Sequence, residues 1–141
     1  TMAGGTVKEI TANAITTSCN DTSGYAIYAI GFSNDKYASD ASGNNNDMIS
    51  SQNSSYNIQT NGTGTNSNWK MKLTSPVDAT IESAFNNTYT AIPSTYTKVA
   101  SYTTNTTGGS ITPKYQITTG SSQPAGTYTG KVTYTVAEGV N

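Results

Sequence analysis

The chain of 141 residues has no histidine, no arginine and a single cysteine, and only 11% of its residues are charged. Without histidine it lacks the usual general base and the commonest neutral metal ligand. A Ser–His catalytic pair is therefore excluded. Cys19 has neither a histidine to activate it nor a second cysteine for an intramolecular disulfide. These absences predict that the protein is not an enzyme.

The charge balance and the lack of long apolar runs argue against two classes of partner. The formal net charge is −1 and all seven basic residues are lysines, which leaves no electrostatic footprint for nucleic acid. No apolar run approaches the roughly 18 residues of a membrane span. Thr1–Thr6 has neither the basic nor the apolar region of a signal peptide. We therefore expect no nucleic-acid partner, no membrane insertion of this segment and, if the protein is exported, a mature fragment or excised domain.

In place of charge, the chain has 26 Thr, 17 Ser and 15 Asn, together with ten Tyr. Disordered chains are poor in aromatic and β-branched residues, so this composition indicates strands and turns. The length suits one domain with its own core. We expect a single ordered domain over residues 1–141.

The clearest strand signal is the alternation from Gly126 to Val136, which continues without a break. Threonines and a lysine occupy one face. The residues of the other face are expected to pack against a sheet: Tyr128, Gly130, Val132, Tyr134 and Val136.

Two earlier segments differ in pattern. Tyr25–Phe32 is apolar on both faces, which predicts a central strand covered on both sides. Thr6–Thr17 carries apolar residues whose phase slips between Val7 and Ile10, which predicts a strand with a bulge or two short strands.

Proline and glycine positions predict where other strands end. Asn68–Leu73 alternates cleanly, with Trp69 on the face expected to form the core, and Pro76 is expected to end this strand. Asn105–Ser110 is expected to be a polar, hairpin-like loop. Pro113 is expected to place the following strand at a sheet edge or at a bulge.

About eight strands emerge at spacings typical of antiparallel sandwiches, and no capped amphipathic helix is present. The predicted fold is all-β: a two-sheet antiparallel β-sandwich with immunoglobulin-like or related Greek-key topology.

The region between Ser33 and Asn68 is rich in Asn, Ser, Gly and Asp, and predicts long loops of the kind that often bind ligands. Its carboxylates Asp35, Asp40 and Asp47 would suit Ca²⁺, although a solvated loop explains the same residues. No other cofactor is expected. Tyr37 and Tyr56 are the candidate exposed aromatics for binding a glycan.

The segment near the start of the chain is the candidate for strand exchange between neighbouring molecules. Its apolar residues are Val7, Ile10, Ala12 and Ala14.

Four segments together resemble exported, β-rich cell-surface proteins of Saccharibacteria-like and Gram-positive bacteria, with a pilin- or adhesin-like β-sandwich. The resemblance is carried by Cys19–Gly31, Asn68–Leu73, Ile92–Ala100 and Gln123–Thr135. It implies an extracellular, cell-surface location and supplies no catalytic residues.

The leading hypothesis is a structural or adhesive module, such as a pilin-like subunit, a stalk or an adhesin domain. Its partners would be other copies of itself or cell-surface proteins and glycans. The alternative is a carbohydrate-binding module that uses loop aromatics.

Overall fold

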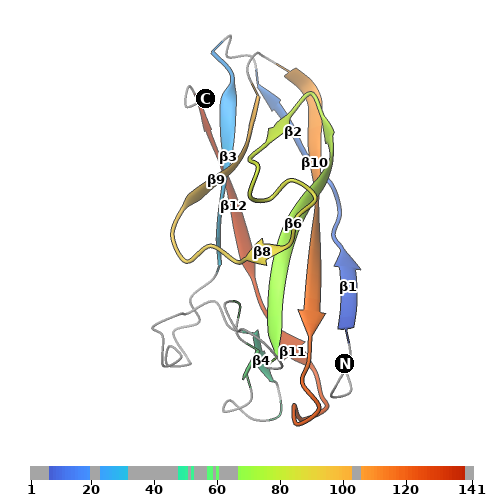
Figure 1. Ribbon diagram of the computed structural model, residues 1–141. Helices are drawn as coiled ribbons and strands as arrows, with labels where there is room; N and C mark the ends of the chain where they lie inside the picture. Colours follow the sequence, from blue (N-terminus) through green and yellow to red (C-terminus); the bar gives the residue numbers. More distant parts are fainter. Residues whose placement is uncertain are drawn as a thin grey trace.

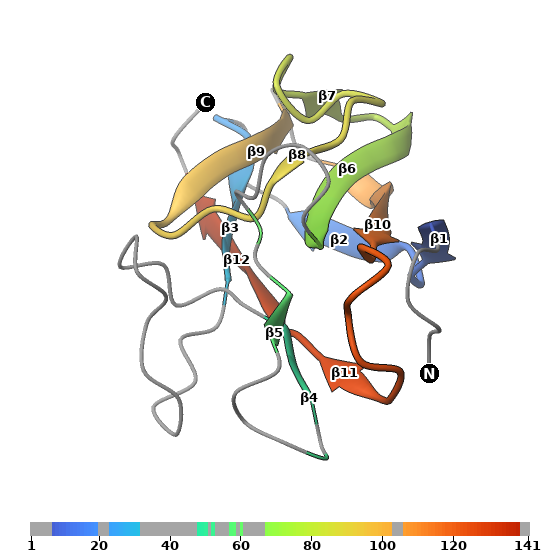
Figure 2. The same cartoon turned by 60° about the horizontal axis from the view of Figure 1, so that its bottom comes forward.

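The protein is an all-β sandwich of two antiparallel sheets, which confirms the predicted fold class (Figures 1 and 2). The computed structural model describes residues 7–19, 23–31, 48–50, 52, 57–58, 60, 67–102 and 106–138, and no helix occurs among them.

The first sheet has the strand order β1-β10-β6-β8, and β2 also pairs with β10. β1 and β2 therefore follow one another along the same side of β10, as the slipped phase of Thr6–Thr17 predicts. The strands are β1 (Val7–Thr11), β2 (Ile15–Cys19), β6 (Asn68–Val77), β8 (Thr90–Ala91) and β10 (Thr106–Thr118).

The second sheet has the order β12-β3-β9-β7, and a small third sheet has the order β11-β4-β5. β3 is a central strand, as its two apolar faces predict. The strands of the second sheet are β3 (Tyr25–Gly31), β7 (Thr80–Ile81), β9 (Thr97–Tyr102) and β12 (Val132–Glu138). Those of the third are β4 (Met48–Ser50), β5 (Asn57–Ile58) and β11 (Tyr128–Thr129).

The strand order shares only part of the constant-type immunoglobulin arrangement. In that fold the second, fifth and fourth strands adjoin in one sheet, and the third and sixth lie in the other. If β3 is counted as the second strand, then β6, β7, β9 and β10 correspond to the third to sixth. With this correspondence the central pairings are kept, since β3, β9 and β7 adjoin in one sheet and β6 and β10 adjoin in the other. The terminal strands exchange sheets: β1 and β2 pair with β10, and β12 pairs with β3.

The core fills the space between the two sheets. Trp69, Met71 and Leu73 of β6 are all buried, which confirms the inward face predicted for this strand. Across from them, Tyr25 of β3 stacks on Tyr102 of β9 with ring centroids 4.3 Å apart. The alternation of β6 thus supplies one wall of the core and the doubly apolar β3 supplies the other.

Pro76 does not end β6, contrary to the sequence expectation, because the strand continues to Val77 through a bulge. Ser75 has a φ of 51°, and the register with β10 shifts at this point. A bulge tolerates proline because the ladder is already interrupted there.

Asn105–Ser110 is also not a loop beyond residue 105, because β10 begins at Thr106. Gly108 has a φ of 78°, and the pairing with β2 shifts register between Thr106 and Gly109. The glycines that suggested a turn therefore form an irregularity within a strand.

Pro113 lies in a strand that is central rather than at an edge, since β10 pairs with β6 on one side and with β1 and β2 on the other. The proline carbonyl accepts a 3.0 Å hydrogen bond from the N–H of Ala12, in the interval between β1 and β2. The N–H that proline lacks would point to this same interval, because both backbone groups of a strand residue face one neighbour. The interruption of the neighbouring strand thus accommodates Pro113.

The sequence predicted one unbroken strand from Gly126 to Val136, and this prediction is wrong. The segment is divided at Gly130 and Lys131 into β11, which pairs with β4, and β12, which pairs with β3. The alternation of burial survives the break, but Val136 is 48% exposed at the open edge of its sheet.

Candidate functional site

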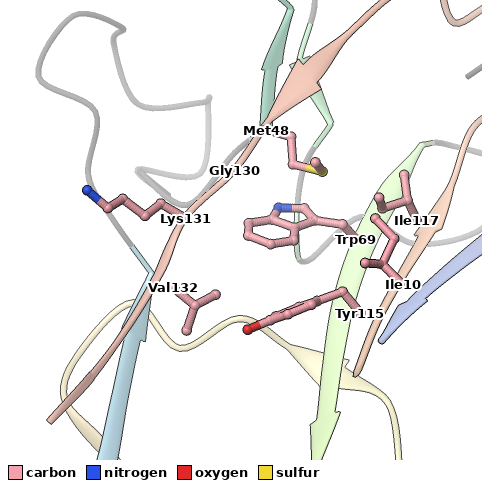
Figure 3. Close-up of a pocket in the computed structure, with 8 residues that line it drawn as sticks. All are labelled: Ile10, Met48, Trp69, Tyr115, Ile117, Gly130, Lys131 and Val132. Carbon is pink, nitrogen blue, oxygen red and sulfur yellow. The ribbon is translucent and has the colours of Figure 1, made fainter. Parts of the chain in front are cut away.

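An apolar pocket of about 280 Å³ lies where β1 and β10 face the start of β12 across the sandwich (Figure 3). β1 and β12 are the terminal strands of their sheets on this same side. The pocket is lined by Ile10, Met48, Trp69, Tyr115, Ile117 and Val132, and by the chain at Gly130 and Lys131.

Trp69 forms the inner wall of the pocket and is held by its backbone as well as by its ring. Its carbonyl accepts a 2.8 Å hydrogen bond from the buried hydroxyl of Thr60. The same hydroxyl accepts a 2.6 Å hydrogen bond from the N–H of Ile92. One buried threonine therefore satisfies a backbone acceptor and a backbone donor, which fixes the position of β6 behind the pocket.

Gly130 lets the chain pass close over the indole of Trp69. A Cβ atom at residue 130 would lie 2.8 Å from Cγ of Met48 and 2.9 Å from Cη2 of Trp69. Both distances are shorter than van der Waals contact, so the site requires the absence of a side chain. Gly130 lies between β11 of the small third sheet and β12, so this close approach occurs where the chain passes from one sheet to the other.

Two tyrosines connect the sheets beside the pocket. The hydroxyl groups of Tyr115 on β10 and Tyr134 on β12 share a 2.7 Å hydrogen bond. Burial is the main cause that raises the pKa of the Tyr115 phenol and the pKa of the Tyr134 phenol above the ordinary value. Both groups therefore stay neutral at physiological pH and serve as a polar link across an apolar interior.

The lining of the pocket favours an apolar group over a sugar. The Tyr115 hydroxyl is engaged with Tyr134, and the Lys131 side chain extends away from the indole of Trp69 in Figure 3. Ligand sites for polar molecules usually combine an apolar wall with a few convergent polar groups. The side chains directed into this pocket are almost entirely aliphatic or aromatic.

A polar cluster on the outer face of the first sheet fastens β1. The Glu9 carboxylate accepts a hydrogen bond from the Tyr89 hydroxyl and lies 3.5 Å from the Lys114 ammonium. The Lys72 ammonium lies 4.6 Å from the centroid of the Tyr89 ring. The hydrogen bond from Tyr89 is the largest cause that lowers the pKa of Glu9, and burial is the largest cause that raises the pKa of Tyr89.

The four residues predicted for strand exchange lie in and just after β1. Val7 is 66% exposed and Ile10 is 41% exposed, although both pair with β10 of the same chain. Ala12 and Ala14 lie in the interval between β1 and β2. Of this set, the structure brings Ile10 to the pocket, and their role in strand exchange stays a prediction.

The loop residues predicted to bind ligands lie outside the described residues. These are the aromatics Tyr37 and Tyr56 and the carboxylates Asp35, Asp40 and Asp47. Within the part of the chain that the structure describes, no group of three or more His, Cys, Asp and Glu residues is arranged to hold a metal ion.

No local pattern in the sequence predicts the pocket. Trp69 lies in the core, as its alternation predicts, but the pocket that it lines also requires the distant residues Ile10 and Gly130. The available signal was Gly130, a glycine on the apolar face of an otherwise bulky alternation. A glycine at such a position often marks close approach of another part of the chain.

Comparison of the chain with protein-family models, with curated proteins and with solved structures found no match. Within the described ranges, no helix is long and apolar enough to cross a membrane.

Proposed function

We propose that the chain is an extracellular cell-surface structural or adhesive module, which acts by binding and scaffolding. A pilin-like subunit, a stalk and an adhesin domain are the forms this module would take. Its partners would be other copies of the chain or cell-surface proteins and glycans. The observation that carries the proposal is the edge strand β12, which ends its sheet among the described strands and begins beside an apolar pocket.

Strand edges support a binding role because they present backbone N–H and C=O groups that another extended chain can pair with. β1 and β12 end their sheets among the described strands, and an apolar pocket lies between them. β12 and the pocket together offer hydrogen bonds along the strand and an apolar contact at one point, the combination used in binding by strand addition. The resemblance to exported β-rich surface proteins supports an extracellular setting for this role.

The alternative, a carbohydrate-binding module, has less support from the described residues. Trp69 is 4% exposed, so its ring is packed in the core and does not form an open platform for a sugar. The predicted platform residues Tyr37 and Tyr56 lie outside the described residues. Direct measurement of glycan binding separates this alternative from the scaffold.

The test combines negative-stain electron microscopy with sedimentation velocity over a range of protein concentrations, and a parallel screen for soluble glycans. A scaffold or adhesive module is expected to self-associate or to bind intact cell-surface material. Compact monomers at every concentration, together with saturable binding to a soluble glycan, would replace the proposal with the carbohydrate-binding alternative.

A further inference from the structure

The exposed edges of the two sheets differ in how well they resist pairing with another chain. β7 and β8 are only two residues long. The edge formed by β1 and β2 is interrupted between the strands. It also carries Lys8 opposite the buried Ile117, so the lysine is on the side that faces the core. Short strands and inward-facing charges are the usual ways in which proteins block edge pairing.

β12 has none of these protections over most of its length. It is seven residues long, pairs regularly with β3, and contains neither proline nor a charged residue from Val132 to Ala137. Among the described strands it ends its sheet. β12 is therefore the longest continuous edge that the described structure leaves open.

The backbone direction along this edge follows from the neighbouring strand. The N–H of Gly31 donates to the carbonyl of Pro93, so the backbone of Gly31 is turned away from β12. Its register partner Val132 is then in a non-hydrogen-bonded pair, and the backbone groups of Val132 point to the open edge. Because the direction of the backbone groups alternates along a strand, the N–H and C=O groups of Tyr134 and Val136 also point to the open edge.

We propose that β12 pairs antiparallel with β12 of a second copy of this chain, in the register that places the two Thr135 residues opposite one another. This inference deepens the proposed scaffold function and rests on it. The register pairs Tyr134 of each copy with Val136 of the other and joins the two four-stranded sheets into one continuous sheet. Val136, which is 48% exposed in the isolated chain, gains a neighbour.

A second copy fits this edge because the edge is complementary to itself. Aromatic residues opposite β-branched residues, and threonine opposite threonine, are among the favourable cross-strand pairs, and the two-fold symmetry forms the Tyr134–Val136 pair twice. The central segment is uncharged, so two identical strands meet without repulsion. Pairing through the same surface on both copies is the commonest arrangement in homo-oligomers, and it closes at a dimer.

Cysteine cross-linking tests the register directly. In a Cys19→Ser background, Thr135→Cys is expected to give a disulfide-linked dimer under mild oxidation, because residues in a non-hydrogen-bonded pair lie about 4.5 Å apart between Cα atoms. Thr133→Cys is the matched control on the same face. Its two copies would be separated by four residues, roughly 13 Å along the strand, which is too far for a disulfide. Equal cross-linking of both variants, or of neither, would overturn the register.

A charge at the edge tests the pairing without any added cysteine. Val136→Lys places an inward-facing lysine on β12, and we expect it to weaken the dimer by roughly tenfold or more. Val7→Lys adds the same charge at an exposed valine on the outer face of β1 and is expected to leave the dimer unchanged. Sedimentation equilibrium measures both variants, and circular dichroism confirms that they are folded.

The outcomes separate this inference from the proposed function. Self-association that survives Val136→Lys but is lost in Val7→Lys would assign the contact to β1, overturning the β12 pairing while keeping the scaffold. A wild-type chain that remains monomeric up to the highest soluble concentration would overturn the β12 pairing. Binding to cell-surface material would then decide the adhesive function separately.

Discussion

β1 and β12 are terminal strands on the same side of the two sheets, yet different interactions hold them in place. All five residues of β1 are exposed, and the strand is fastened by the Glu9 cluster on its outer face. Half-buried and exposed residues alternate along β12 up to Thr135. The hydrogen bond between the Tyr134 and Tyr115 hydroxyl groups links β12 to the opposite sheet. One edge is thus held by charged and polar surface contacts and the other by packing.

The difference shows that position in a sheet does not determine how an edge strand behaves. A strand held mainly by exposed polar contacts contributes little burial, because such contacts are weak in water and screened by salt. A strand held by packing is stable where it lies, and its outer backbone is left free for another chain. Substitutions in each strand therefore have different expected consequences for stability.

The largest effect is expected in the break between β11 and β12. Gly130→Ala introduces a Cβ at distances of 2.8–2.9 Å from Met48 and Trp69, and we expect a loss of about 1–3 kcal/mol in the free energy of unfolding. Urea denaturation measures the loss. Thr129→Ala, at the exposed neighbouring residue, is the control and should change little. An unchanged stability for Gly130→Ala would mean that the chain above Trp69 can shift without cost.

A pH-dependent effect is expected from the tyrosine pair that crosses the sandwich. The folded-state pKa values of Tyr115 and Tyr134 are raised, whereas in the unfolded chain a tyrosine titrates near pH 10. Above about pH 10 the unfolded state releases protons that the folded state retains. Stability should therefore fall by up to about 1.4 kcal/mol per pH unit for each phenol.

Tyr134→Phe should make this alkaline loss shallower by removing one of the two phenols of the pair. Urea denaturation between pH 8 and pH 11 measures the slope. Tyr96→Phe removes a phenol that is 62% exposed and serves as the control. Equal slopes for Tyr134→Phe and the wild type would contradict the assignment of the pH dependence to this pair.

The smallest effect is expected in β1. The lowered pKa of Glu9 means that its carboxylate stabilises the folded state above the ordinary carboxyl pKa, and that this contribution is lost as the pH falls through the lowered value. Glu9→Gln should therefore increase amide hydrogen exchange in β1 at pH 7, and this increase should become smaller as the pH is lowered through the pKa of Glu9. Amide exchange in β12 should not change. Equal responses of both strands would remove the distinction between them.

The sequence predicted the elements whose environment is encoded locally. The alternation of Trp69, Met71 and Leu73 identified a buried face, and the doubly apolar Tyr25–Phe32 identified a central strand, because each pattern reports directly on burial. The slipped phase between Val7 and Ile10 correctly indicated two short strands as one of its two readings.

The errors arose where a residue's conformation depends on a strand distant in the sequence. Pro76 is accommodated by a bulge against β10, and Pro113 by the interruption between β1 and β2. No local pattern around either proline contains that information. The pocket was missed for the same reason, since Ile10, Trp69 and Gly130 come together only when both sheets have formed.

Pro113 also has a consequence for how the first strands align during folding. Its missing N–H leaves any residue placed opposite it without one ladder hydrogen bond, and in the native register that residue is Ala12, where the ladder is already interrupted. If β1 and β2 slipped by two residues along β10, Pro113 would lie opposite a residue of β1 or β2. The interval between β1 and β2 would then face a residue of β10 that has an N–H to donate. Each hydrogen bond lost in this way costs about 0.5–1.5 kcal/mol, so a single proline in β10 selects the native alignment of two neighbouring strands over its nearest competitors.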